Sequence, residues 1–119
     1  MGRRARSRDR LRAPTSDYTD PSGNVLTLRG SLTAAARREY GQVLSEGGRA
    51  SQTREDAWQR GVELLFERLA VRWVIAGAPI DRQRELLIRF RGASADERAW
   101  VRATLREHCA EHFPDVNAP

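Results

Sequence analysis

The longest apolar-rich segment, residues 53–77, constrains the fold more than any other stretch of the chain. Apolar side chains recur in it at steps of three and four residues, which is the spacing of one face of an amphipathic helix. These residues are Trp58, Val62, Leu65, Leu69, Trp73 and Ala76. Thr53 and Asp56 form a capping pattern at its start, and Gly77 with Pro79 forms a stop signal at its end. The segment therefore predicts one central helix of about 23 residues.

A second apolar line, formed by Leu64, Val71 and Ile75, lies nearly opposite the first on the same predicted helix. A helix with two apolar faces is covered on both sides, by its own domain or by a partner. Two interpretations stay open: complete burial within a four-helix fold, or a protein interface at Leu64, Val71 and Ile75. Charged residues interrupt the segment, so no membrane-spanning helix is expected.

The flanking sequence predicts three more helices. They cover residues 32–46, a stretch ending near residue 91, and residues 95–112, where Ser94 and Glu97 form a strong capping box. The turn-rich residues 20–24 precede VLTLR, which favours one short β-strand or hairpin before the first helix. The predicted fold class is all-α: a four-helix domain over residues 17–119, preceded by a flexible basic arm over residues 1–16.

Composition narrows the classes of function. All 21 basic residues are arginine, which is typical of a GC-rich bacterial genome. The lack of lysine excludes a Walker A loop and a Schiff-base lysine. The single cysteine excludes an internal disulfide and favours a reducing compartment. No signal peptide is visible, because no apolar stretch follows the basic start, so we expect a cytoplasmic protein.

The positive charge of the chain is concentrated at its start. Residues 1–12 contain six arginines and one aspartate, which gives +5, and this equals the net charge of the whole chain. An arginine-rich arm can contact nucleic acid or an acidic partner; alternatively, it is a solvated terminus. The candidate contact residues are Arg3, Arg4, Arg6, Arg8, Arg10 and Arg12.

Two histidines are the weak candidates for a metal site. His108 and His112 are four residues apart and so share one helix face. A metal site needs a third ligand, and none stands out in the sequence; the alternative is that both rings cap the core. Cys109 is expected to be a small buried residue. We expect no catalytic residues and no cofactor.

The order of elements resembles that of small phage tail assembly chaperones. It consists of the short VLTLR strand, a helix, and a long helix that ends near Trp73 and the Gly77-Ala78-Pro79 turn. This resemblance implies an assembly factor that shields a partner through an apolar helix face, and it assigns the chain to no family. The main expectation is a small non-enzymatic interaction or adaptor protein, with metal binding at His108 and His112 as a further alternative.

Overall fold

The computed structural model describes residues 14–45, 54–116 and 118. The described helices and strands, in chain order, are β1 (Thr15–Thr19), β2 (Val25–Arg29), α2 (Ala34–Ser45), α3 (Arg54–Leu69), β3 (Ala70–Ile75), β4 (Ala78–Ile80), α4 (Gln83–Arg91) and α5 (Ala95–His112). The strands form one antiparallel sheet in the order β1-β2-β3-β4. The fold of the described residues is therefore mixed, with a four-stranded sheet and helices.

The all-α prediction is wrong, because the expected central helix changes its secondary structure midway. Helix α3 ends at Leu69, and β3 begins at the next residue. Residues 71–75 are mostly β-branched or aromatic, which suits a pleated strand. They pair with β2, where Leu26 lies opposite Trp73. Pairing with a strand distant in sequence overrides the helical spacing of the same residues.

A two-residue turn joins β3 to β4 where the sequence predicts a helix stop. Ala76 has a φ of 51° and Gly77 has a φ of 80°, and a type I′ hairpin turn requires positive φ at both central residues. The main-chain N–H of Ala76 donates to the side-chain oxygen of Asn24 at 3.0 Å. Gly77 and Pro79 therefore mark a hairpin.

The hairpin that the sequence allows before the first helix is present as β1 and β2. In its turn, the Asp20 carboxylate accepts the main-chain N–H groups of Ser22 at 2.8 Å and Asn24 at 2.9 Å. This arrangement is the usual role of aspartate at the start of a turn. Thr15 and Ser16, which were expected in the arm, belong to β1.

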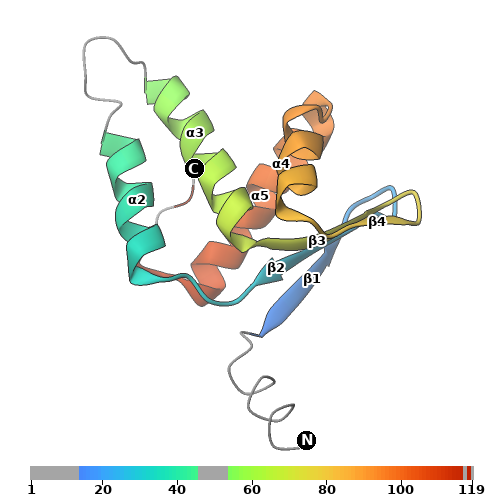
Figure 1. Ribbon diagram of the computed structural model, residues 1–119, viewed down its shortest axis with the longest axis horizontal. Coiled ribbons are helices and arrows are strands. Elements are labelled where there is room, and N and C mark those ends of the chain that lie inside the picture. The colour runs from blue at the N-terminus through green and yellow to red at the C-terminus, as the bar shows by residue number, and fades with distance from the viewer. Residues whose placement is uncertain (1–13, 46–53, 117, 119) are drawn as a thin grey trace, which may run out of the picture.

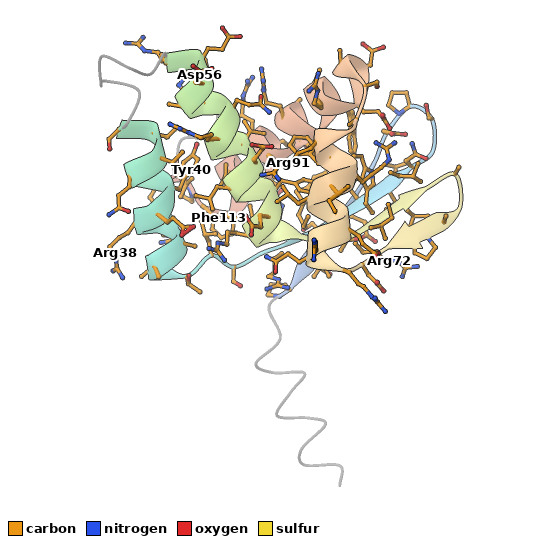
Figure 2. The ribbon with its side chains drawn as sticks, turned by 45° about the horizontal axis from the view of Figure 1, so that its top comes forward. Arg38, Tyr40, Asp56, Arg72, Arg91 and Phe113 are labelled. Carbon is orange, nitrogen blue, oxygen red and sulfur yellow. The ribbon has the colours of Figure 1, made fainter. Side chains whose placement is uncertain are left out.

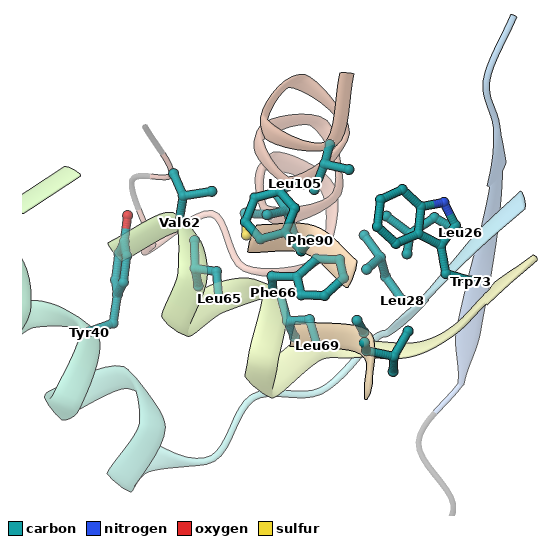
Figure 3. Packing of buried hydrophobic residues seen from close by; sticks show 14 of the residues in the cluster. Leu26, Leu28, Tyr40, Val62, Leu65, Phe66, Leu69, Trp73, Phe90 and Leu105 are labelled. Atoms are coloured by element: carbon teal, nitrogen blue, oxygen red, sulfur yellow. The ribbon is translucent and has the colours of Figure 1, made fainter. Parts of the chain in front are cut away.

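Helices α3, α4 and α5 gather on one side of the sheet, and α2 packs along α3 away from the strands (Figure 1). Residues alternate along β2, so Leu26 and Leu28 face the helices and are fully buried. Figure 3 shows these leucines beside the aromatic centre of the core. There, Phe66 stacks on Phe90 with ring centroids 4.6 Å apart and meets the Trp73 ring at 5.8 Å.

The predicted core stripe is buried except at its two end residues. Val62, Leu65 and Leu69 are buried on α3, and Trp73 is buried on β3. Trp58 is 49% exposed, and Ala76 lies in the hairpin turn. The stripe fails at Ala76 because the helix stops at residue 69. At the other end the first buried position of α3 is Ala57 and not Trp58. The capping residue proposed at position 53 lies outside the described residues.

The predicted capping box of the last helix is confirmed. The Ser94 hydroxyl accepts the main-chain N–H of Glu97 at 3.1 Å, and the Glu97 carboxylate accepts the main-chain N–H of Ser94 at 2.9 Å. Arg89 also donates to this carboxylate at 2.6 Å, so the α4–α5 connection is held from both sides. The pKa of Glu97 is lowered by these contacts, chiefly by the Ser94 main chain.

Candidate functional site

One face of the sheet has no helix over it in the described part of the chain. Side chains alternate along each strand, so the residues between the buried ones point to this face. None of these residues is buried. In strand order, one row across this face contains Thr19, Val25, Val74 and Pro79, and the next contains Asp17, Thr27 and Arg72. Figure 2 shows Arg72 directed away from the helices. We call these two rows the uncovered face.

Three apolar residues lie side by side in one row of the uncovered face. An antiparallel sheet with one wet face usually carries polar residues there. Val25 and Val74 are neighbours on adjacent central strands, and Pro79 follows on the edge strand. The second row is polar, with the Thr27 hydroxyl donating to the Asp17 carboxylate at 2.6 Å. An apolar row bordered by a polar row is a common layout for a protein contact.

Sequence reasoning missed this face, although part of its signal was available. The alternation in VLTLR places Val25, Thr27 and Arg29 on the side opposite Leu26 and Leu28. The contribution of β3 could not be found, because its residues had been assigned to a helix. Only the pairing of the two strands brings the halves of the apolar row together.

The two edges of the sheet differ in their capacity to accept another strand. Strand β4 has three residues and contains Pro79, and proline lacks the N–H that a further strand needs. Strand β1 has five residues and pairs with β2 on one side only within the described chain. The outer edge of β1 is therefore the more accessible edge.

The two candidate metal ligands lie where α5 packs on the first hairpin. His108 is fully buried. Its Nε2 is 2.7 Å from the main-chain oxygen of Arg29, and its Nδ1 is 2.7 Å from the Tyr18 hydroxyl. A carbonyl oxygen only accepts, so Nε2 carries the proton and the Tyr18 hydroxyl donates to Nδ1. His108 thus joins α5 to both β1 and β2.

The environment of His108 favours its neutral form. Burial is the largest influence and lowers the pKa of His108; the Arg29 carbonyl raises it, His112 lowers it and Glu111 raises it, with a net downward shift. The His108 and His112 rings are 4.4 Å apart, so a charge on one ring disfavours a charge on the other. A neutral imidazole with both nitrogens hydrogen-bonded is a structural link between helix and sheet.

The geometry does not favour metal binding or thiol chemistry at this end of α5. No group of three or more His, Cys, Asp or Glu side chains suited to a metal occurs among the described residues. Both nitrogens of His108 have protein partners, and Nε2 of His112 is 3.4 Å from the Ser16 hydroxyl. Burial raises the pKa of the Cys109 thiol to about 11, so the reactive thiolate is scarce at neutral pH.

The predicted interface residues Leu64, Val71 and Ile75 do not form one helix face. Leu64 lies on α3, while Val71 and Ile75 lie on β3. All three are half-buried, and Leu64 and Ile75 pack against the core. Val71 is the extra residue of a bulge, because Leu28 pairs with Ala70 and Thr27 pairs with Arg72. The premise of a two-faced helix therefore does not hold, and an interface role for these residues stays a prediction.

Val71 lines a groove of about 550 Å³ between α2, the end of α3 and the start of α4. Its walls carry both signs of charge, including the ion pair of Arg68 with Glu39 at 2.9 Å and the carboxylate of Asp81. A second groove, of about 580 Å³, is lined by the half-exposed Trp58 together with other residues that include Arg102. Neither groove has the single charge sign or the enclosed polar group that would indicate a ligand class.

The six arginines proposed as contact residues lie outside the described residues, so their role stays a prediction. A comparison of the chain with protein-family models, curated proteins and solved structures finds no match. In the described residues, no helix combines the length and the apolar character needed to cross a membrane. A function for this chain is therefore inferred from the surface of the described residues.

Proposed function

We propose that this chain is a small non-enzymatic interaction protein that contacts a partner protein through the uncovered face. The observation that supports the proposal is the apolar row of Val25, Val74 and Pro79 on a sheet face that no described helix covers. These residues contribute little to the core, which lies on the other face. Their apolar area is available for burial against another protein surface.

Photo-crosslinking tests this proposal. Benzoylphenylalanine is introduced at Val74 and, as a matched control, at Ala99, an exposed residue of α5. In cells that produce the chain, the Val74 position is expected to yield one discrete crosslinked protein, and Val25→Glu is expected to abolish that product. Equal products from both positions, or no product from Val74, would contradict the proposal.

An assembly factor remains an alternative within the same class of function. It would shield its partner with the uncovered face, since the predicted apolar helix face is divided between α3 and β3. The identity of the protein crosslinked at Val74 distinguishes a structural component of an assembly from a signalling or enzymatic partner. The proposal includes a cytoplasmic location, which the single cysteine favours.

A second candidate function is nucleic-acid contact by the arginines of residues 1–12. It is favoured by the charge layout, because these residues carry +5 and the rest of the chain is neutral. The test compares binding of the full chain to a DNA duplex with binding of a variant that has glutamine at all six arginines. Binding that falls steeply with salt and is lost in the variant is expected, and unchanged binding would remove the arginines from this role.

A further inference from the structure

The main-chain groups on the outer edge of β1 are arranged to accept another strand. Two main-chain hydrogen bonds at the ends of the β1–β2 pairing show which residues of β1 bond to β2. The Gly30 N–H donates to the Pro14 oxygen at 2.6 Å, and the Asp20 N–H donates to the Asn24 oxygen at 2.9 Å. In antiparallel pairing, alternate residues turn their main-chain groups to the partner strand and the others turn them outward. The outward set on β1 is Thr15, Asp17 and Thr19.

Acidic side chains lie on both sides of this edge. Asp17 is exposed on the uncovered face. On the helix side, Glu107 and Glu111 are exposed on α5. Glu107 precedes His108, which is 2.7 Å from the Tyr18 hydroxyl, and Glu111 precedes His112, which is 3.4 Å from the Ser16 hydroxyl, so both glutamates adjoin residues that contact β1. At 100° per residue, these two glutamates lie on the side of His108 away from the core residue Cys109.

An extended segment added to β1 would therefore meet acids with both sets of its alternating side chains. The residue opposite Asp17 would point to the uncovered face, and its neighbours would point toward Glu107 and Glu111. The basic residues of the neighbouring strands on this face include Arg29, paired with Thr15, and Arg72, two strands away from Asp17. Pairing of β1 with β1 of a second copy is disfavoured, because a two-fold axis near Asp17 would bring like charges together.

We propose that the outer edge of β1 binds an extended, arginine- or lysine-bearing segment of a partner protein as a fifth strand. This inference rests on the proposed interaction function and adds the chemical character of the partner. Main-chain hydrogen bonds to Thr15, Asp17 and Thr19 would provide the alignment. Asp17, Glu107 and Glu111 would select the basic side chains.

The test measures, by fluorescence anisotropy, binding of the full chain to a fluorescein-labelled nine-residue peptide of three Arg-Arg-Val repeats, which places arginine in both alternating sets of side chains. Binding is expected at 50 mM salt, with weakening at 300 mM salt and no binding of the corresponding peptide with glutamate in place of arginine. The triple variant Asp17→Asn, Glu107→Gln, Glu111→Gln is expected to bind about tenfold more weakly, because three attractive charges are removed. A control variant, Asp96→Asn with Glu55→Gln, is expected to bind as the original chain does.

N-methylated peptides separate strand addition from simple ionic attraction. Two further peptides keep the charges but carry N-methyl groups on alternate main-chain nitrogens, one at the odd-numbered residues and the other at the even-numbered residues. Only one of the two loses the N–H groups that would face β1, and that peptide is expected not to bind. Equal affinity of the methylated and unmethylated peptides would overturn the proposal. The proposal would also be overturned if the triple variant bound the arginine peptide as tightly as the original chain does.

The Arg-rich residues of this chain are the rival occupant of the edge. If the full chain binds no peptide, and the variant with glutamine at the six arginines does bind it, the edge is taken by the chain itself and the proposal fails. Either failure leaves the crosslink from Val74 unaffected, because Val74 lies on β3 and not on β1. Loss of that crosslink alone would count against the uncovered face and not against strand addition.

Discussion

The Tyr18 hydroxyl donates a 2.7 Å hydrogen bond to Nδ1 of His108 and so joins the first strand to the last helix across 90 residues of sequence. The two rings also meet edge to face, with centroids 5.6 Å apart. His108 is buried, and a buried polar atom that loses its partner destabilises the fold by its full desolvation penalty. The contact is therefore a structural link that mutation can probe.

Tyr18→Phe is expected to lower the free energy of unfolding by about 1–3 kcal/mol, because it leaves Nδ1 of His108 buried without a donor. Urea denaturation followed by circular dichroism measures the change. Ser16→Ala is the matched control on the same strand. Its hydroxyl is 3.4 Å from Nε2 of His112, a long contact whose loss should change stability by less than about 0.5 kcal/mol. Equal effects of both substitutions would contradict the assigned link.

Stability should fall as the pH drops below about 6.5, the ordinary pKa of histidine. The folded protein holds the pKa of His108 below this value, chiefly by burial. The unfolded chain therefore binds a proton first, and acidification favours unfolding until the folded-state pKa is reached. The loss is at most about 1.4 kcal/mol per pH unit for one such group.

Urea midpoints at pH 7.5, 6.5 and 5.5 test this pH dependence, because most carboxylates remain ionised over that range. His108→Gln is expected to be less stable at pH 7.5 and to show a weaker dependence on pH between 7.5 and 5.5. A midpoint that stays constant over this range in the original chain would refute the assignment of a buried neutral imidazole.

Two glycine substitutions should have opposite signs. Gly77 has a φ of 80°, and an added Cβ there would meet no atom within 4 Å. Gly77→Ala should therefore destabilise by about 1–2 kcal/mol through backbone strain alone. Gly41 lies within α2, also with open space around it, so Gly41→Ala should stabilise by about 0.5–1 kcal/mol. Thermal melts of the two variants test this contrast, and shifts in the same direction would be inconsistent with the β3–β4 turn.

Ser94→Ala should destabilise the protein by about 0.5–2 kcal/mol, the usual effect of removing a helix N-cap. The hydroxyl accepts the Glu97 main-chain N–H at 3.1 Å. Ser94→Thr keeps the acceptor oxygen and should stay within about 0.5 kcal/mol of the original. Denaturant midpoints of the two variants decide the matter, and a Ser94→Ala midpoint equal to the original would show that the cap contributes nothing.

The sequence by itself determined the features that depend on a few neighbouring residues. The Ser94–Glu97 capping box and the turn at Asp20 could be predicted because each of their hydrogen bonds joins residues at most four positions apart. That turn and the alternation in residues 25–29 allowed either one short strand or a hairpin, and the structure has the hairpin. The buried middle of α3 followed from its helical spacing.

Only the tertiary structure decided where α3 stops and which residues lie on the uncovered face of the sheet. Residues 70–75 satisfy a helical spacing and a strand composition at once, and the presence of β2 beside them selects the strand. The uncovered face joins residues from both hairpins, and the acidic side chains beside the outer edge of β1 come from β1 and α5, which meet at the Tyr18–His108 contact. These features depend on side chains brought together from distant positions, so no local pattern in the sequence contains them.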